Sequence, residues 1–510
     1  FHSIMVNSNP ETVSTDFDTS HRLYFEPLDE EGLRDILENE CQVEQEGEDT
    51  RNTDGSVQGA PLTIVQFGGQ TAINLAWPLA RAGLPIGGSS AETIDLAEDR
   101  GRFEELMGRH GIPQPPGAAI MSVEEALNQA QVIGYPVLVR PSYVLGGRAM
   151  EIVHNARDLI EYMTHAVELS NGKPILIDKY MEGKEVEVDA LCDGVEVLIP
   201  GVMEHIERAG VHSGDSMAVY PGINLTPWEV DTLVDYTRRI GLALQVKGLM
   251  NVQYVIMPGH DERPSEGAAP SVFVLEVNPR ASRTVPFLSK VTGVPMVRLA
   301  TNIMLGKTLA ELGYRGGLWK RQKLVAVKAP VFSMSKLMGV DTYLGPEMKS
   351  TGEVMGVDST FEAAITKALL AAQLMPPPHG AVLLSIADRD KSEAAPIIRE
   401  VYQQGYRLYA TEGTAALIEA LGLSVTLVTK KLGEGHPNVV DVIVEGIVDV
   451  VVNTVTGDRT PLRDGFEIRR AAAEHRIPCF TSLDTARAAV RSLARGQEGY
   501  AVMPLHKYLA

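Results

Sequence analysis

Short apolar segments with strand character alternate with helical patterns along much of the chain, and this alternation limits what it can fold into. Residues 3–6 form such a segment, and residues 62–67 run into the turn Gly68-Gly69-Gln70-Thr71 before a helical pattern. A strand that passes through a glycine-rich turn into a helix is typical of α/β folds. After Pro376-Pro377-Pro378 the alternation returns, with strands predicted at residues 382–386, 407–410, 425–428, 448–453 and 478–481.

The middle of the chain mixes strands and helices less regularly. Strands are predicted at residues 135–140, 175–180, 185–191, 250–257 and 271–277, surface inserts at 42–60 and 258–270, and mostly helix at 307–372. At roughly 150 residues per domain, 510 residues correspond to about three domains. We therefore predict a chain that is α/β and α+β multidomain, divided into residues 1–98, 99–306, a helical connecting segment at 307–373, and 374–510.

Charge and cysteine content exclude several classes of protein. The chain has 46 Lys and Arg against 66 Asp and Glu, a formal net charge of -20, whereas nucleic acids and anionic membranes attract basic surfaces. Cys41, Cys192 and Cys479 lie far apart, without the spacing of a zinc site or a disulfide framework. No apolar run is long enough to span a bilayer. We expect a cytoplasmic protein with no nucleic-acid partner and no membrane partner.

Four oxygen-bearing side chains are predicted to converge on one face of a hairpin. Asn251 and Gln253 are two residues apart on one strand, as are Glu276 and Asn278 on the next, and positions two apart share a face. In an unbulged hairpin, Gln253 lies opposite Glu276 and Asn251 opposite Asn278. Oxygen ligands of this kind suit Mg²⁺ or Mn²⁺ rather than zinc, and leave room for phosphate oxygens. A solvent-facing polar sheet would explain the same spacing equally well.

Arginines follow directly after this patch. Arg280 and Arg283 are three residues apart, and Arg140 ends another apolar strand. Guanidinium groups can neutralise the charge of a phosphoryl group during its transfer. Taken alone, each arginine is more typical of a surface ion pair, but their joint placement favours a phosphate site. The segment Gly210-Val211-His212-Ser213 fits either a nucleotide cradle or a structural turn.

Five segments resemble the large chain of carbamoyl-phosphate synthase. They begin at Asn7, Val139, Gly210, Glu276 and Gly345 and read NSNPETVSTD, VRPSYVLGGRAM, GVHSGDS, EVNPR and GPEM. The resemblance is collinear, covers essentially the whole chain, and looks like the C-terminal half of that family. It implies a truncated pre-ATP-grasp Rossmann-like domain, an ATP-grasp domain, a helical segment and a Rossmann-like, methylglyoxal-synthase-like regulatory domain. The family has a further strand before Asn7, so we expect this chain to be a fragment.

The resemblance also implies an activity and its partners. The C-terminal half of the family phosphorylates carbamate with ATP, giving carbamoyl phosphate for arginine and pyrimidine biosynthesis. The N-terminal half of the same large chain phosphorylates bicarbonate, and a small glutamine amidotransferase chain supplies ammonia. The implied enzyme is therefore a glutamine-hydrolysing carbamoyl-phosphate synthase, an ATP-grasp ligase that uses ATP with Mg²⁺ or Mn²⁺.

Carried over to matching positions, the resemblance assigns roles to particular residues. Gln253, Glu276 and Asn278 match metal ligands, with Gln253 and Glu276 also meeting the nucleotide. Asn251, Arg280 and Arg283 match active-site partners, and Arg100 and Arg140 match phosphate-facing arginines. The matching nucleotide contacts are Asp178, Lys179, Met181, Glu185, Gly210, Val211, His212 and Ser213, with Glu185 suited to accept from ribose hydroxyls.

An allosteric nucleotide site is implied in the last domain. Thr411-Glu412-Gly413-Thr414 lies where a strand ends and a helix begins, and backbone N–H groups there favour a phosphate. An ordinary capped helix start is the alternative. Lys391, Lys430 and Asn453 match other effector positions, whereas Val455 stands where the family has Thr. Glu207 and Asp215 resemble positions used for ornithine in bacterial members, and whether ornithine acts here stays open.

Other interpretations fit parts of the sequence. Another ATP-grasp enzyme, such as a biotin carboxylase, would not need the regulatory domain after Pro376-Pro377-Pro378. A catalytically silent nucleotide sensor would not need the intact set of Gln253, Glu276, Asn278, Arg280 and Arg283. A methylglyoxal synthase alone would not need residues 1–370.

Overall fold

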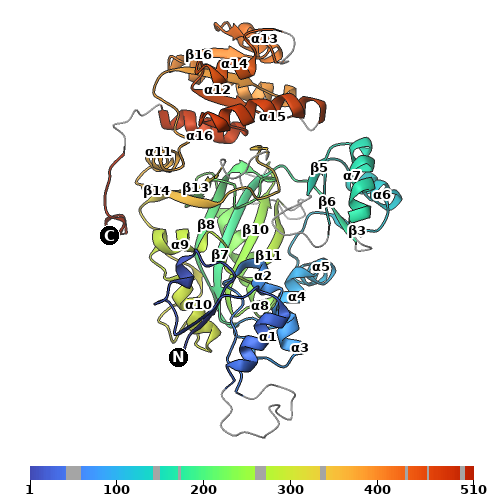
Figure 1. The fold of residues 1–510 in the computed structure, drawn as a ribbon, viewed down its shortest axis with the longest axis vertical. Coiled ribbons are helices and arrows are strands. Elements are labelled where there is room, and N and C mark those ends of the chain that lie inside the picture. The colour runs from blue at the N-terminus through green and yellow to red at the C-terminus, as the bar shows by residue number, and fades with distance from the viewer. Residues whose placement is uncertain are drawn as a thin grey trace.

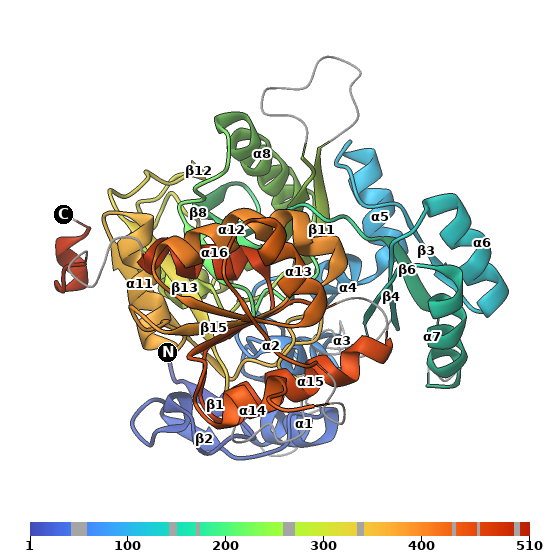
Figure 2. The ribbon, with the colours of Figure 1, turned by 90° about the horizontal axis from the view of Figure 1, so that it is seen from above.

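The computed structural model describes residues 1–41, 59–141, 150–169, 174–258, 271–333, 341–430, 435–455, 459–493 and 500–509. Most of the two expected surface inserts, and residues 142–149 of the motif that begins at Val139, lie outside these ranges. Along its longest axis the molecule has an N-terminal unit at one end, a central sheet, and a C-terminal domain at the other end (Figure 1). A small lobe projects from the side of the central sheet (Figure 2).

The N-terminal unit packs helices around a small apolar core. Its elements are β1 (Ile4–Val6), β2 (Arg22–Tyr24), α1 (Glu30–Asn39), α2 (Gly69–Ile73), α3 (Ala76–Arg81) and α4 (Ala91–Glu98). Helix α1 starts where the Asp29 carboxylate accepts from Gly32 N, and its apolar stripe is buried against Val65 and Leu79. The strand predicted at residues 62–67 is corrected: this segment makes a single bridge, Thr63 to Ile86, and no ladder.

The lobe is a four-stranded antiparallel sheet covered by two helices. Its strand order is β3-β6-β4-β5, formed by β3 (Gly117–Ile120), β4 (Val137–Pro141), β5 (Glu151–Val153) and β6 (Ile175–Lys179). Helices α6 (Val123–Ile133) and α7 (Ala156–Leu169) pack on this sheet through Ala126, Leu159 and Met163. Helix α5 (Arg100–Arg109) leads from the N-terminal unit into the lobe.

The central sheet has the order β11-β10-β7-β8-β9-β13-β14, with β12 paired to β8. The strands are β7 (Lys184–Cys192), β8 (Val197–Arg208), β9 (Ala218–Tyr220), β10 (Gly248–Ile256), β11 (Val272–Asn278), β12 (Gly317–Leu318), β13 (Val325–Val331) and β14 (Gly352–Asp358). Val186, Val188 and Ala190 face the core under α8 (Pro227–Ala243). Alternate residues of β7 face the other side, where α9 (Val285–Thr292) and α10 (Met296–Met304) cover Leu191.

The structure corrects the expectation for residues 307–373. We expected a mostly helical connecting segment, but β13 and β14 form an antiparallel pair within the central sheet, and among the described residues of this segment only α11 (Phe361–Ala371) is a long helix. The short apolar run Val325–Val331 cannot be distinguished from a helix by periodicity alone, because it is buried on both faces.

The C-terminal domain is a parallel five-stranded α/β unit, as predicted, and the multidomain α/β architecture is confirmed. Its strand order is β17-β16-β15-β18-β19, formed by β15 (Ala381–Ser385), β16 (Arg407–Ala410), β17 (Thr426–Leu427), β18 (Val450–Asn453) and β19 (Cys479–Phe480). The helices are α12 (Lys391–Gln403), α13 (Glu412–Ala420), α14 (Val439–Val444), α15 (Arg459–Glu474) and α16 (Leu483–Leu493).

The C-terminal domain packs directly against the central part of the molecule. One continuous core joins α11 of the central part to β15, α12 and α16, through Phe361, Leu369, Ala486 and Val490. Beyond residue 499, the segment 500–509 returns to the central part, where Lys367 Nζ donates to Tyr508 OH at 2.9 Å and also to Ala501 O. We call residues 500–509 the C-terminal strap.

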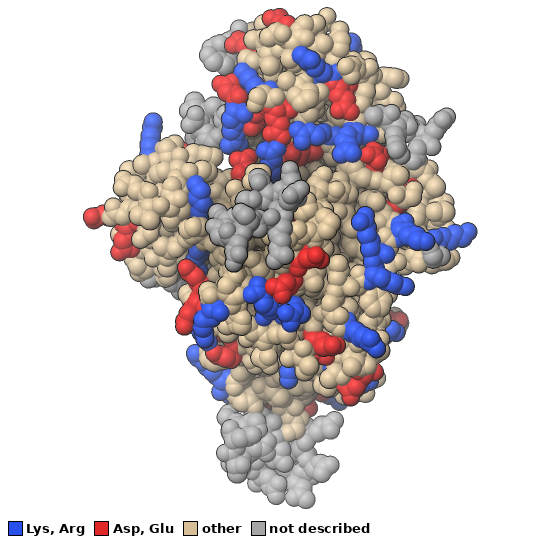
Figure 3. All heavy atoms as spheres, turned by 180° about the vertical axis from the view of Figure 1, so that it is seen from behind, with Lys and Arg blue, Asp and Glu red and all other residues tan. Residues whose placement is uncertain are grey.

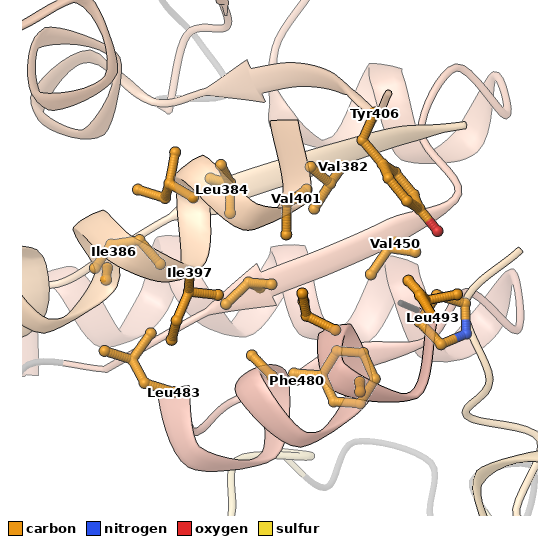
Figure 4. Close-up of a pocket in the computed structure, with 17 residues that line it drawn as sticks. Val382, Leu384, Ile386, Ile397, Val401, Tyr406, Val450, Phe480, Leu483 and Leu493 are labelled. Carbon is orange, nitrogen blue, oxygen red and sulfur yellow. The ribbon is translucent and has the colours of Figure 1, made fainter. Parts of the chain in front are cut away.

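A cavity of about 30 Å³ lies inside the C-terminal domain, between its sheet and helices α12 and α16. Leu384, Ile397, Val450 and Phe480 line it, and the Tyr406 hydroxyl stands at its edge (Figure 4). An apolar void of this size, with no polar group aimed into it, is a packing defect of the core rather than a ligand site.

The surface carries both signs of charge. Lys and Arg are interspersed with Asp and Glu over the face in Figure 3, which agrees with a solvated surface rather than a single-sign binding face. Among the helices within the described ranges, none is both long and apolar enough to cross a membrane.

Candidate active site

The hairpin of β10 and β11 has the register that the sequence predicts. Asn251 lies opposite Asn278 and Gln253 opposite Glu276, and the register shifts only after Gln253. Asn278 Nδ2 donates to Glu276 Oε1 at 3.0 Å, and Gln253 Nε2 donates to Ser213 Oγ at 3.1 Å. The four predicted side chains therefore share one face of the sheet.

Strand β7 adds carboxylates to the same face, because Asp189 pairs with Asn251 and Glu187 with Gln253. Asn251 is buried and its Nδ2 donates to Glu187 Oε1 at 2.7 Å and to Asp189 Oδ1 at 2.9 Å. Asn251 is thus committed to these carboxylates rather than to the open part of the hairpin. We call the whole set the polar face: Glu185, Glu187, Asp189, His205, Asn251, Gln253, Glu276 and Asn278.

His205 and the glutamates of β7 form a buried charged group. His205 Nε2 lies 3.3 Å from Glu187 Oε2, and Nδ1 lies 3.6 Å from Glu185 Oε1. Burial opposes the charged imidazole, but the two carboxylates outweigh it and raise the pKa of His205. Burial likewise opposes ionisation of Glu187, yet its hydrogen bond to His205 lowers the pKa of Glu187. The proton therefore belongs on His205, beside an ionised Glu187.

Two further carboxyl groups on β7 are held closer to neutrality. Burial raises the pKa of Glu185 to about 7 and the pKa of Asp189 to about 7, and the negative charge of Glu187 adds to both shifts. Lys328 on β13, which sequence analysis missed, is also buried and donates to Ser213 O at 2.9 Å. Its charge favours the ionised form of Glu187.

Arg280 and Arg283 leave the end of β11 with few partners. Arg280 Nη2 donates to Asn278 Oδ1 at 3.3 Å, and Arg283 Nη1 to Ser350 Oγ at 3.3 Å. Neither forms an ion pair with a carboxylate in the described part of the chain. Taken alone, each arginine suggested a surface ion pair, and within the described residues the structure shows no such pair for either of them.

Arg100 and Arg140 meet at Asp178 in the lobe. Arg100 forms an ion pair with Asp178, and Arg140 Nε lies 4.0 Å from the other carboxylate oxygen. Lys179 Nζ donates to Gly134 O and Tyr135 O, each at 3.0 Å. Met181 lies in the connection from β6 to β7, where its carbonyl accepts from Gly183 N at 3.0 Å. These predicted residues thus line the junction of lobe and central sheet.

The segment after β8 closes on this junction. Gly210 has φ +109°, and a Cβ there would lie 2.8 Å from Tyr180 OH, so no larger residue fits without displacement. Val211, beside it, borders a cavity of about 120 Å³ between the lobe, β8 and the C-terminal domain. His212 Nδ1 accepts from Gly214 N at 3.0 Å, and burial lowers the pKa of His212, so its neutral ring carries the proton on Nε2.

The two carboxylates that resemble ornithine positions are engaged within the chain. Glu207 accepts from Met217 N at 2.8 Å and from Thr485 Oγ1 at 2.9 Å. Asp215 accepts from Lys349 N and Ser350 N, each at 2.8 Å. Glu207 nevertheless borders the same cavity of about 120 Å³.

The donor set of the hairpin fits a divalent cation that prefers oxygen. Glu276 supplies a carboxylate, and Gln253 and Asn278 supply amide oxygens, while both amide nitrogens are already engaged. Within the described ranges no cluster of three His, Cys, Asp or Glu residues has the arrangement of a metal site. A cation here would therefore depend on the Glu276 carboxylate, these amide oxygens and phosphate oxygens; one carboxylate together with phosphate oxygens suits Mg²⁺.

In the C-terminal domain several predicted effector residues gather at the start of α13. A Cβ on Gly413 would lie 2.8 Å from Lys391 Nζ, which places that ammonium beside the segment from Thr411 to Thr414. Lys391 also pairs with Asp388 at 2.6 Å. Asn453 is buried on β18, where its Oδ1 accepts from Arg469 Nη1 at 2.6 Å.

Three family models match the chain in order. They are described as "Carbamoyl phosphate synthase preATP-grasp domain" at residues 1–96, "Carbamoyl-phosphate synthase L chain, ATP binding domain" at 99–312, and "MGS-like domain" at 393–481. A carbamoyl phosphate synthase large chain from Thermomicrobium roseum is 57% identical over 99% of this chain and 45% of its own length. One from Thermoanaerobacter sp. is 48% identical over 99% and 44%. The chain thus spans less than half the length of these curated relatives.

Solved structures show the fold of most of the chain, between 72% and 73% of its residues. The biotin carboxylase domain of Hydrogenobacter thermophilus 2-oxoglutarate carboxylase, in complex with MgADP and bicarbonate, matches at TM-score 0.54 and 19% identity over 73% of this chain and 84% of that one. Biotin carboxylase from Campylobacter jejuni matches at TM-score 0.54 and 16% identity, over 72% and 84%. These structures show the fold, whereas the three family models and the identity to the bacterial large chains show that the chain belongs to the carbamoyl phosphate synthase large-chain family.

Proposed function

We propose that this chain phosphorylates carbamate with ATP, as the C-terminal half of a glutamine-dependent carbamoyl-phosphate synthase large chain. An oxygen of carbamate attacks the γ-phosphorus, the bond from that phosphorus to the bridging oxygen breaks, and ADP leaves with the electron pair. The observation that carries the proposal is the placement of Glu276 between Gln253 and Asn278, directly before two arginines that form no ion pair with any described carboxylate.

Each group at the site has a task in this reaction. Gln253, Glu276 and Asn278 would hold Mg²⁺ or Mn²⁺, which offsets the negative charge of the nucleotide phosphates. Arg280 and Arg283 have fixed positive charge and free donors, so they bind the transferring phosphoryl group more strongly as its charge spreads. Arg100 and Arg140 exchange part of their contact with Asp178 for nucleotide phosphates.

The lobe and the segment after β8 bind the rest of ATP. Lys179 and Met181 lie in the strand and connection that border the nucleotide, and Gly210 to Ser213 close over it from the central sheet. Glu185 accepts from ribose hydroxyls, for which it must turn partly away from His205. The buried group of His205, Glu187 and Asn251 keeps the polar face rigid beneath these residues.

The same proposal names the partners. Ammonia comes from a small glutamine amidotransferase chain, and carbamate from the bicarbonate-phosphorylating N-terminal half of the large chain. A nucleotide effector binds at Lys391, Thr411, Thr414, Lys430 and Asn453, with ornithine as a further candidate effector at Glu207 and Asp215. The product feeds arginine and pyrimidine biosynthesis in the cytoplasm.

Formation of ATP from carbamoyl phosphate and MgADP tests the proposal, because this partial reaction needs neither glutamine nor bicarbonate. We expect the wild-type chain to form ATP in proportion to enzyme and metal. Biotin with bicarbonate and ATP is the comparison, since the fold is shared with biotin carboxylases. Biotin-dependent ADP release without ATP formation from carbamoyl phosphate would overturn the proposal.

A further inference from the structure

Gln66 belongs to the N-terminal unit, but its side chain is buried beneath the turn that carries Arg280. It is 0% exposed, and its Nε2 donates to Pro279 O at 2.8 Å. Its backbone carbonyl accepts from Ala281 N at 2.9 Å. One residue therefore bonds the backbone on both sides of Arg280.

Ser89 holds the Gln66 amide from the other side. Gln66 Oε1 accepts from Ser89 N at 3.0 Å, and Ser89 Oγ accepts from Lys247 N at 3.0 Å, just before β10. At Gly88, which has φ +89°, a Cβ would lie 2.1 Å from Gln66 Oε1. The amide thus sits in a closed space in which its donor and acceptor each have a fixed direction.

The arginines themselves have little else to fix them. Besides its bond to Asn278, Arg280 donates only to Ala281 O at 3.2 Å, and Arg283 makes long contacts with Ser350, within the described residues. Their place at the site depends on where the backbone of the turn lies. A displacement of about 1 Å at a reacting centre can cost on the order of 100-fold in rate.

We propose that Gln66 is a positioning residue for phosphoryl transfer: it fixes the backbone of residues 279–281 and, through it, the guanidinium groups of Arg280 and Arg283. This inference rests on the proposed function of the site. It gives the N-terminal unit a part in the reaction, although Gln66 itself does not touch the substrate.

Gln66→Met tests the inference, because methionine has similar length but can neither donate nor accept these hydrogen bonds. We expect turnover per bound nucleotide, in ATP formation from carbamoyl phosphate and MgADP, to fall on the order of 100-fold with KM for ADP little changed. Calorimetric stoichiometry with ADP gives the folded, binding-competent fraction. Amide exchange of residues 277–284 should quicken, because the turn loses the side-chain hydrogen bond to Pro279 O that holds Ala281 N–H against the Gln66 backbone carbonyl.

Thr237→Val is the matched control. Thr237 is also 0% exposed, and it shares a hydrogen bond of 2.7 Å with Tyr254 on β10, away from the turn. The control loses a buried hydrogen bond of the same sheet. It should lower thermal stability while leaving turnover per bound nucleotide and exchange of residues 277–284 as in the wild type.

Gln66→Glu supplies a second variant with a distinct signature. One oxygen of the new carboxyl group can still accept from Ser89 N, but the other can donate to Pro279 O only when protonated. We expect its turnover, relative to wild type, to rise as the pH falls. A ratio that is flat with pH, or wild-type turnover per bound nucleotide in Gln66→Met, would overturn the inference.

The exchange measurement separates this inference from the proposed function. If the wild-type chain binds ADP but forms no ATP, the proposed function fails, and exchange of residues 277–284 still decides whether Gln66 fixes the turn. Unchanged exchange in Gln66→Met overturns the inference whatever the turnover. Faster amide exchange in Gln66→Met with wild-type turnover overturns the inference too, because catalysis would then not depend on a fixed turn.

Discussion

Glu276 is the carboxylate of the polar face that remains partly exposed beside two amide oxygens, whereas the three on β7 are buried. Glu276→Gln keeps the size of the side chain but removes its charge. We expect ATP formation from carbamoyl phosphate and MgADP to fall by at least about 100-fold, measured at saturating metal. Glu474→Gln, on the exposed side of α15, is the control. Wild-type rate and metal dependence in Glu276→Gln would show that the ligand assignment is wrong.

Arg283 offers a second test at this scale. Arg283→Lys keeps the charge but loses the planar, two-pronged donor geometry. We expect turnover to fall on the order of 100-fold, with nucleotide affinity changed much less. Because Arg283 forms no ion pair with a described carboxylate, the melting temperature should stay close to wild type. A variant that melts early yet turns over normally would instead assign Arg283 a structural role.

Asp189 makes stability depend on pH. Its pKa rises from an ordinary value of 3.8 to about 7, chiefly through burial and then through the charge of Glu187. Between these values the folded chain binds a proton that the unfolded chain does not, so this group makes stability fall as the pH rises from about 4 to about 7. The melting temperature of Asp189→Asn minus that of the wild type should therefore increase as the pH rises from about 4 to about 7. A difference in melting temperature that stays constant over this pH range would contradict the assignment.

The residues that sequence analysis identified at the site are those with local patterns. The pairing of Gln253 with Glu276 could be predicted because the two strands of a hairpin pair symmetrically about its turn. Predicting this register requires no information about the rest of the fold. Glu187, His205 and Lys328 were missed because their strands reach the site by pairings that are distant in sequence. Glu185, Glu187 and Asp189 alternate with apolar residues along β7, which is typical of a strand with one acidic face, but this alternation cannot show that β10 lies beside it.

At the scale of elements, the segment from Asp341 to Thr351 links the C-terminal domain to Arg283 and Asp215, near the candidate active site. Arg469 of α15 donates through Nε to Asp341 Oδ1 at 2.6 Å. Farther along, Ser350 N donates to Asp215, and Ser350 Oγ lies 3.3 Å from Arg283 Nη1. One short segment thus contacts both the predicted effector domain and a predicted catalytic arginine.

The ion pair at the start of this segment is unequally buried, with Arg469 1% and Asp341 31% exposed at the side chain. Asp341→Asn leaves a buried guanidinium without its carboxylate, whereas Arg469→Met leaves a carboxylate that water can reach. We therefore expect Asp341→Asn to lower the melting temperature more than Arg469→Met, because an unpaired buried charge is the costlier state. If Arg469→Met lowered the melting temperature more than Asp341→Asn, the hydrogen bond to Asn453 would be the main interaction that stabilises the buried Arg469 side chain.

The strands at residues 325–331 and 352–358 show where element prediction from sequence fails. Both lie in the segment that was expected to be mostly helical, and neither alternates cleanly between polar and apolar residues. They are strands because β9 offers a free edge to β13, and β13 in turn pairs with β14. The strand conformation of these two segments is therefore stabilised by pairing within the whole sheet, and local sequence preference does not determine it.

At the scale of the whole molecule, the shared core changes what truncation should do. From Pro376-Pro377-Pro378 alone, a chain that ends after Leu374 should keep ATP binding and lose only its effector response. The structure buries Leu369 and Phe361 of α11 in the core that α11 shares with α16. We expect that truncation to lower the melting temperature and to increase binding of a hydrophobic dye, because it exposes this apolar surface.

Removal of residues 500–509 alone is the matched comparison. It should have a smaller effect on dye binding, because the strap covers less of the core and leaves α16 in place. Retained melting temperature and no added dye binding after truncation at Leu374 would contradict the shared core.

The strap has a mechanical consequence. The chain that follows the C-terminal domain is held on the central part, where Lys367 Nζ donates to Ala501 O and Ala501 N donates to Asp358. The chain that enters the domain leaves the same central part after α11, and the shared core lies between these two connections. A domain that is tethered at both of its chain ends stays near its partner surface when the shared core opens, so its return is an intramolecular step at high effective concentration.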